Sequence, residues 1–135
     1  MLKKCILLDI DGVLNSLGVI DYDNRTIISH PWGMWQIKNE NVEFLKYLST
    51  TKAKMYWISS WEEESNYIND FLNIEDFECI PKDKVKDFIS KKIFKKNILI
   101  VDDELEIENI KTIKPDARSG LSKEDRENIL RWYNI

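Results

Sequence analysis

The fold of this chain is decided by the run Asp9-Ile10-Asp11-Gly12-Val13-Leu14-Asn15. The run follows residues 4–8, a largely apolar stretch with the composition of a buried strand. Asp9 and Asp11 stand two positions apart, so they share one side of an extended chain. Because ligands of open parallel sheets collect at the carboxyl ends of the strands, we expect both carboxylates to face a binding crevice. Asp followed by Gly is also a common turn, and the run taken alone fits that interpretation equally well.

Outside this run, short apolar stretches alternate with longer helical patterns, which is typical of an α/β protein with a mainly parallel sheet. We predict a Rossmann-like, doubly wound sheet with helices on both faces. Residues 12–38 show no clean period, and we predict a flap or long loop there. Ser122 and Asp125 have capping-box spacing for a final amphipathic helix. The remaining predicted strands are 53–58, 77–80 and 97–101, and the remaining predicted helices are 39–50, 61–72, 83–93 and 105–111.

Length and composition favour a single domain over residues 1–135 with no separate cap domain, because 135 residues with 43% hydrophobic content support one sizeable core. The net charge of -4 argues against a dedicated nucleic-acid coat and leaves only a local basic patch for such a role. Cys5 and Cys79 lie in apolar runs, which indicates free buried thiols in a reducing cytosol. The apolar run before Asp9 is too short for a signal peptide or membrane helix, so we predict a cytoplasmic protein without a membrane partner.

A second acidic pair, Asp102-Asp103, also ends an apolar strand, and it should therefore face the same rim as Asp9 and Asp11. Converging carboxylates need a cation to offset their repulsion, and oxygen ligands without a nearby histidine favour Mg²⁺ over zinc. The alternative interpretation is that Asp103 and Glu104 merely cap a following helix.

The order of these motifs resembles the phosphatases of the haloacid dehalogenase (HAD) superfamily over nearly the whole chain. The run Trp57-Ile58-Ser59-Ser60-Trp61 is similar to a Trp-x-Thr-x-Trp form found in a subgroup of small bacterial, phage and RNA-repair-associated phosphatase domains. The resemblance implies that Ser59 supplies a phosphate-binding hydroxyl, with Ser60 beside it as a helix N-cap and possible substrate contact. It also implies a phosphate-binding lysine before the second acidic pair. Lys82, Lys84 and Lys86 all qualify, and the spacing to Asp102 and Phe88-Ile89 favours Lys84, although these lysines also fit a solvated helix face.

The resemblance implies a Mg²⁺-dependent phosphomonoester hydrolase. Asp9 would attack phosphorus to form an aspartyl-phosphate, and Asp11 would act as general acid and then base. Ser59 and Lys84 would bind the non-bridging phosphate oxygens. The metal ligands would be Asp9, the backbone carbonyl of Asp11, and one or both of Asp102 and Asp103.

Without a cap domain the site should be open, which suits a nucleotide or a phosphorylated nucleic-acid end as substrate. Trp32 and Trp35 in the flap, with His30 beside them, could stack on a base, although packing of the flap on the body also explains both tryptophans. Nothing in the sequence implies an obligate protein partner. The possible basic track consists of Lys82, Lys84, Lys86, Lys91, Lys92, Lys95 and Lys96.

Two other classes of function remain open. A receiver-like phosphoacceptor domain also combines an acidic pair, a phosphorylatable aspartate, a hydroxyl and a lysine on a doubly wound sheet, but there the acidic pair comes first in the chain. A catalytically silent binding module is disfavoured because every motif position carries a competent side chain.

Overall fold

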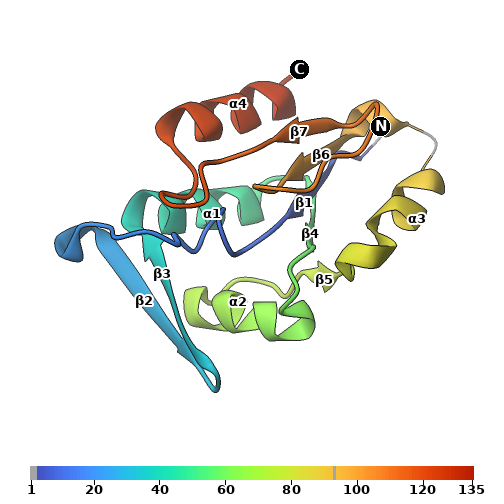
Figure 1. The fold of residues 1–135 in the computed structure, drawn as a ribbon. Coiled ribbons are helices and arrows are strands. Elements are labelled where there is room, and N and C mark those ends of the chain that lie inside the picture. Colours follow the sequence, from blue (N-terminus) through green and yellow to red (C-terminus); the bar gives the residue numbers. More distant parts are fainter. Residues whose placement is uncertain (1–2, 93) are drawn as a thin grey trace.

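The centre of the computed structural model, which describes residues 3–92 and 94–135, is a five-stranded sheet (Figure 1). The strand order is β5-β4-β1-β6-β7, and all four neighbouring pairs run parallel. This confirms the predicted α/β class with a parallel sheet, while the doubly wound arrangement stays a prediction. The strands are β1 (Cys5–Leu8), β4 (Lys54–Trp57), β5 (Glu78–Cys79), β6 (Ile98–Val101) and β7 (Lys111–Ile113).

Two apolar clusters pack against the sheet, because successive side chains of a strand point to opposite faces. Ile6 and Leu8 of β1 belong to the larger cluster, which includes side chains of α1, α2 and α4. Cys5 and Leu7 belong to the smaller cluster, which includes side chains of α3. All four residues of β1 are buried, which explains why this strand reads as a continuous apolar run. The helices are α1 (Asn39–Thr50), α2 (Asn66–Leu72), α3 (Val85–Ser90) and α4 (Lys123–Tyr133).

Of the flap or long loop predicted at 12–38, the second half is not an irregular loop but an antiparallel hairpin of β2 (Arg25–His30) and β3 (Gly33–Lys38). The hairpin extends away from the five-stranded sheet (Figure 1). Ile28 is paired with Trp35, and both are buried. The strand signal was weak because only a few positions of the hairpin are buried, so polar and apolar residues do not alternate cleanly.

The predicted helix at 105–111 is also wrong: residues 105–110 are irregular and lead directly into β7. Asp102 Oδ1 accepts hydrogen bonds from the backbone N–H groups of Glu104 and Leu105, at 2.9 Å each. Asn109 has a φ of 67°, which a right-handed helix cannot accommodate. The bonds to Asp102 have the pattern of a helix N-cap, but the left-handed backbone of Asn109 is incompatible with a helix over 105–111.

The predicted capping box of the last helix is confirmed by reciprocal hydrogen bonds between Ser122 and Asp125. Cys5 and Cys79 are free thiols, as predicted, and only Cys5 is fully buried. The predicted helix at 83–93 is shorter than expected: a 3₁₀ turn at Lys82–Lys84 leads into α3, and residue 93 lies outside the described residues. Across residues 3–92 and 94–135, every helix is too short or too polar to span a membrane.

Candidate active site

The predicted site residues meet at the carboxyl edge of the sheet because β1 lies between β4 and β6. Asp9 directly follows β1, Asp102 directly follows β6, and Ser59 comes two residues after β4. The backbone N–H of Asp9 donates to the carbonyl of Val101 at 3.0 Å, which continues the pairing of β1 with β6 to the strand ends. Asp9, Asp102 and Ser59 are all buried, with exposed fractions of 3%, 0% and 1%.

A tight turn follows Asp9 and Ile10, and Gly12 makes it possible. The N–H groups of Val13, Leu14 and Asn15 all approach the carbonyl of Ile10, at 3.1, 2.9 and 2.9 Å. Gly12 has a φ of 81°, in the region that favours glycine. A Cβ at this position would lie 2.6 Å from Cγ of Asp103, so glycine also lets the second acidic pair approach the first.

Three carboxylates form an acidic cluster, which we define as Asp9, Asp102 and Asp103. Each contributes an oxygen, and these oxygens all lie within 4.8 Å of one another. Oδ2 of Asp102 is buried and accepts no hydrogen bond from any residue that the structure describes. The ammonium of Lys82 lies 3.1 Å from this oxygen, and a set of carboxylate oxygens this close together also suits a hard divalent cation. The cluster therefore fits Mg²⁺, whereas the carboxylate of Asp11 lies outside it.

Lys82, and not the favoured Lys84, contacts the acidic cluster. Its Nζ lies 2.9 Å from Oδ2 of Asp9 and 3.1 Å from Oδ2 of Asp102. Only the contact with Asp9 has hydrogen-bond geometry, so the contact with Asp102 is a charge contact. Lys84 and Lys86 are exposed. The preference for Lys84 is thus corrected by the geometry: the chain enters α3 through a 3₁₀ turn that places its first lysine, Lys82, beside Asp9.

Burial in the cluster changes the acidity of its members. Burial raises the pKa of Asp9 to about 7, and the charge of Asp102 adds to the effect, while the hydrogen bond and charge of Lys82 oppose it. Burial alone would lower the pKa of Lys82, but its contacts with Asp9 and Asp102 outweigh burial and raise it. Burial and the neighbouring charge of Asp102 likewise raise the pKa of Asp103. A cation bound among these carboxylates would favour their ionised forms.

Asp11 is held by both of its carboxylate oxygens. Oδ1 accepts a hydrogen bond from Nδ2 of Asn15 at 2.8 Å, and Oδ2 accepts one from Nε1 of Trp61 at 2.9 Å. Asp11 is half-buried, so a substrate or water can still reach it. Sequence reasoning gave Trp61 no function. The available signal was its place as the second tryptophan of the Trp57–Trp61 run.

The two serines after β4 differ in environment. Ser59 is buried, and its Oγ accepts a hydrogen bond from the backbone N–H of Trp61 at 3.1 Å. Ser60 is exposed and is not the predicted N-cap, because the following 3₁₀ turn, Glu62–Ser65, has Trp61 at that position. The hydroxyl of Ser59 holds the turn instead, which leaves its own hydrogen available as a donor.

The two flap tryptophans have different surroundings. Trp35 is fully buried and packs on His30 and Trp61, with ring centroids 4.1 and 5.4 Å apart. It therefore cannot stack on a base, and its predicted substrate contact is wrong. Trp32 has 63% of its surface exposed near the turn of the hairpin, so it remains available to a ligand.

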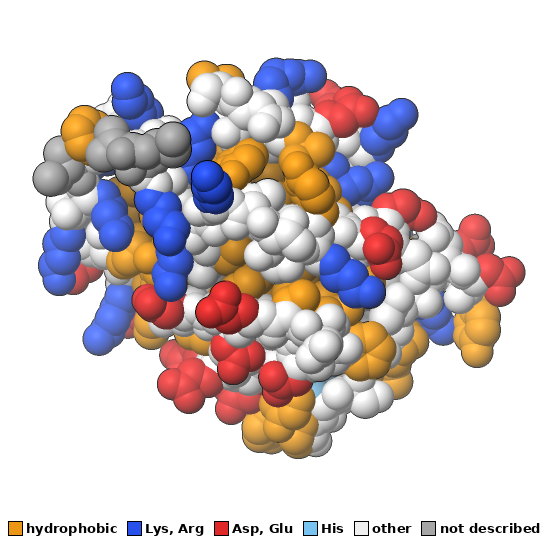
Figure 2. Space-filling model, turned by 180° about the vertical axis from the view of Figure 1, so that it is seen from behind, with side chains coloured by type: hydrophobic (Ala, Val, Ile, Leu, Met, Phe, Trp, Pro, Cys, Tyr) orange, Lys and Arg blue, Asp and Glu red, His pale blue; other side chains and the backbone are white. Residues whose placement is uncertain are grey.

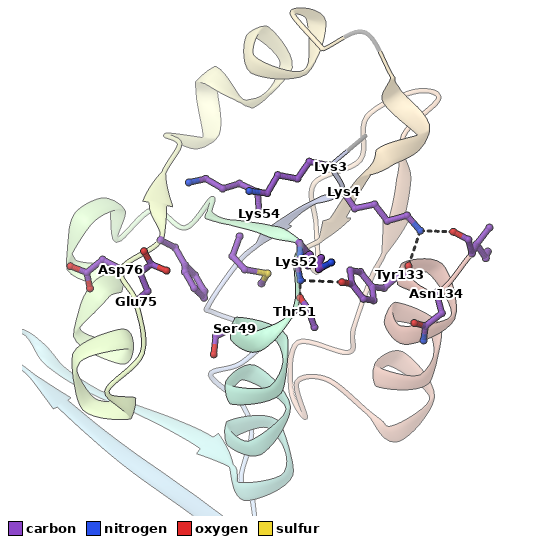
Figure 3. A pocket seen from close by; sticks show the side chains of 14 residues that line it. Lys3, Lys4, Ser49, Thr51, Lys52, Lys54, Glu75, Asp76, Tyr133 and Asn134 are labelled. Carbon is purple, nitrogen blue, oxygen red and sulfur yellow. Dashed lines mark hydrogen bonds between the residues drawn. The ribbon is translucent and has the colours of Figure 1, made fainter. Parts of the chain in front are cut away.

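A separate hollow of about 960 Å³ lies at the opposite, amino-terminal edge of the sheet (Figure 3). Its lining comes from residues just before β1, β4 and β5 and from the end of α4. None of the predicted site residues is among the described residues that line this hollow. Because parallel sheets bind ligands at their carboxyl edge, the acidic cluster is the stronger candidate.

We compared the chain with models of known protein families and found no match, and a comparison with curated proteins found none either. The site itself is therefore the guide to what the chain can do. Its arrangement combines a buried carboxylate beside an ammonium group, a cluster suited to a divalent cation, a hydroxyl donor and a second, anchored carboxylate. These groups can bind a doubly charged oxyanion and present a nucleophile to it.

Proposed function

We propose that this protein is a Mg²⁺-dependent phosphatase of the HAD type, which hydrolyses a phosphomonoester through Asp9. The observation that carries the proposal is the contact of Lys82 with Asp9 and Asp102 in a cluster whose Asp102 Oδ2 has no hydrogen-bond partner among the described residues. A nucleophilic carboxylate needs such cations beside it to approach a negatively charged phosphate.

In the first step, Asp9 forms a bond to phosphorus while the bond to the leaving oxygen breaks. Asp11 donates a proton to that oxygen, so the leaving group departs as an alcohol. The ammonium of Lys82 and the hydroxyl of Ser59 donate hydrogen bonds to the non-bridging phosphate oxygens. Mg²⁺ bound by Asp9, Asp102, Asp103 and the backbone carbonyl of Asp11 would supply positive charge that offsets the repulsion between nucleophile and phosphate.

In the second step, water attacks the phosphorus of the aspartyl-phosphate, and Asp11, now a carboxylate, accepts its proton. Phosphate leaves and the carboxylate of Asp9 is regenerated. A long-lived phosphoacceptor switch has no use for such a base. The anchored position of Asp11 beside the nucleophile's strand therefore favours a hydrolase over a receiver-like domain.

We further propose that the substrate is a nucleotide or a phosphorylated nucleic-acid end. Trp32 is exposed on the hairpin and offers a face on which a base can stack. Figure 2 shows lysine and arginine side chains along the left and upper parts of the face in view, while Asp and Glu side chains gather along its lower edge. Exposed lysines can bind a polyanion despite the net charge of -4. Five lysines of the expected track are exposed, namely Lys84, Lys86, Lys91, Lys95 and Lys96.

The first test is Asp9→Asn, which preserves the shape of the side chain but removes the nucleophile. Hydrolysis of p-nitrophenyl phosphate in Mg²⁺ should be abolished, while circular dichroism shows an intact fold. Asp70→Asn is the matched control, because Asp70 is exposed on α2 and should keep wild-type turnover. Normal turnover by a folded Asp9→Asn variant removes Asp9 from the reaction.

The second test uses Asp11→Asn to separate the hydrolase from the switch. With an activated aryl phosphate the leaving group needs little protonation, so the variant should still form an aspartyl-phosphate at Asp9. Because an amide cannot activate water, this adduct should accumulate and appear in intact mass spectra after acid quench as a hydroxylamine-sensitive phosphoryl mass. A wild-type adduct that persists for minutes, with no longer lifetime in Asp11→Asn, would favour the switch instead.

A further inference from the structure

The side chain of Trp61 contacts Asp11 from a distant part of the sequence. Its Nε1–H donates to Oδ2 of Asp11 at 2.9 Å across 50 positions of the chain. Asn15 Nδ2 donates to the other oxygen, Oδ1, at 2.8 Å. With both oxygens bonded, the carboxylate cannot rotate about its side-chain bonds without losing at least one partner. Each oxygen keeps a second acceptor site for a proton or a substrate group.

The ring of Trp61 is itself fixed by the β2–β3 hairpin. The His30 ring lies 4.8 Å from it at 66°, and the Trp35 ring lies 5.4 Å from it at 88°, both edge-on contacts of the kind aromatic rings prefer. The backbone N–H of Trp61 donates to Oγ of Ser59. Trp61 is therefore held at both ends, by the hairpin and by the turn that carries the phosphate-binding hydroxyl.

The second anchor of Asp11 depends on the same hairpin. Oδ1 of Asn15 accepts a hydrogen bond from the backbone N–H of Gln36 in β3 at 2.8 Å. Because Asn15 uses its oxygen for β3 and its nitrogen for Asp11, its amide is oriented by the hairpin. Both groups that hold Asp11 thus take their positions from the hairpin.

We propose that Trp61 is a positioning residue that holds the carboxylate of Asp11 in the orientation that proton transfer requires, with His30 and Trp35 seating its ring. The inference rests on the proposed function, in which Asp11 must reach the leaving oxygen and then the attacking water. Proton transfer requires a separation of hydrogen-bond length, so a displaced carboxylate is a poor acid and base even when it is chemically intact.

The test is Trp61→Phe, which keeps an aromatic ring against His30 and Trp35 and removes the N–H donor together with part of the indole ring. Phenyl phosphate has a poorer leaving group than p-nitrophenyl phosphate and depends more on protonation by Asp11. We expect the ratio of kcat/KM for phenyl phosphate to kcat/KM for p-nitrophenyl phosphate to fall about tenfold or more, by the usual cost of a misplaced reacting group. With p-nitrophenyl phosphate as substrate, the fraction of Trp61→Phe that carries the aspartyl-phosphate at steady state should rise as well.

Trp57→Phe is the matched control, because Trp57 is buried and its Nε1 donates to Asn66 and Asn69, away from Asp11. It removes the same kind of hydrogen bond and lowers stability, but it should leave the substrate ratio unchanged. An equal change of the ratio in both variants, or an unchanged ratio in Trp61→Phe, overturns the proposal.

A measurement without substrate separates this inference from the proposed function. The indole N–H resonance of Trp61, identified by its loss in Trp61→Phe, should shift in Asp11→Ala and stay in place in Asp70→Asn. A wild-type protein that hydrolyses no phosphate ester refutes the proposed function, and the indole resonance then decides alone whether Trp61 holds Asp11. An indole resonance indifferent to Asp11→Ala refutes the positioning contact itself.

Discussion

Replacing Lys82 with methionine tests whether the lysine chosen by the geometry is the one that binds phosphate. Methionine keeps much of the length of the side chain and removes the ammonium that lies 2.9 Å from Asp9 and 3.1 Å from Asp102. The matched control is Lys84→Met, two positions along the chain, where the side chain is exposed. The family resemblance favours Lys84 and the geometry favours Lys82, so the pair of variants separates the two hypotheses directly.

The expected loss follows from the surroundings of Lys82. Removing one preorganised donor to developing charge typically costs about 10²–10³ in rate, or about 2.7–4 kcal/mol. The side chain of Lys82 is 36% exposed, so water can partly replace the ammonium, and the loss should lie near the lower value. We therefore expect kcat/KM of Lys82→Met to fall about a hundredfold and that of Lys84→Met to stay within about twofold.

The assay is steady-state hydrolysis of p-nitrophenyl phosphate in saturating Mg²⁺, together with thermal melts of each variant with and without the metal. Mg²⁺ should still stabilise Lys82→Met, because the carboxylates of the acidic cluster remain and a competing cation has been removed. A Lys82→Met variant with nearly wild-type kcat/KM, or a hundredfold loss in Lys84→Met, would refute the assignment of Lys82.

Two further outcomes are expected. At a hundred times its dissociation constant, Mg²⁺ should stabilise the fold by about 2.7 kcal/mol and raise Tm by several degrees. Excess EDTA should lower Tm again. A Tm that changes with neither Mg²⁺ nor EDTA contradicts the metal site. Burial raises the pKa of Cys79 from 9.0 to about 11, and the charges of Glu63 and Glu62 add to the effect. At pH 8, iodoacetamide should therefore alkylate this thiol about a hundredfold more slowly than an exposed cysteine peptide. The alkylation rate should rise about tenfold per pH unit up to that pKa. Mass spectrometry of the Cys79 peptide over time measures this, and alkylation at the rate of the free peptide would show that the thiol is not shielded.

The sequence was sufficient to place those site residues whose position depends only on where a strand ends. Asp9 and Asp102 could be placed together from the strand pattern alone, because each ends a fully apolar run and parallel strands share a carboxyl edge. Ser59 is different, because only the resemblance of the Trp57–Trp61 run points to it, and its place two residues after β4 then brings it to the same edge. The two aspartates needed no side-chain detail.

The sequence was not sufficient to place residues whose position depends on a side-chain contact or on a single turn. Counting along the chain could not show that a 3₁₀ turn begins at Lys82 and brings that lysine to the cluster. Nor could local spacing reveal that Asn109 adopts a left-handed conformation, which a helix over 105–111 cannot contain. The bond from Trp61 to Asp11 spans 50 positions, so the Trp57–Trp61 run marks Trp61 but does not reveal its partner.

The central place of β1 in the sheet has a consequence for how the protein folds. Both neighbours of β1 pair with it in parallel, and parallel neighbours are reached only through long crossover connections. Asp9 meets Lys82 across 73 positions, so a local hairpin cannot preassemble that contact. Topologies that depend on such distant contacts fold slowly, because the entropy of closing long loops is lost before the contacts form. Asp9 and the pair Asp102-Asp103 come together only when β6 docks beside β1, so their mutual repulsion should slow that docking step. A divalent cation would then accelerate folding at the docking step.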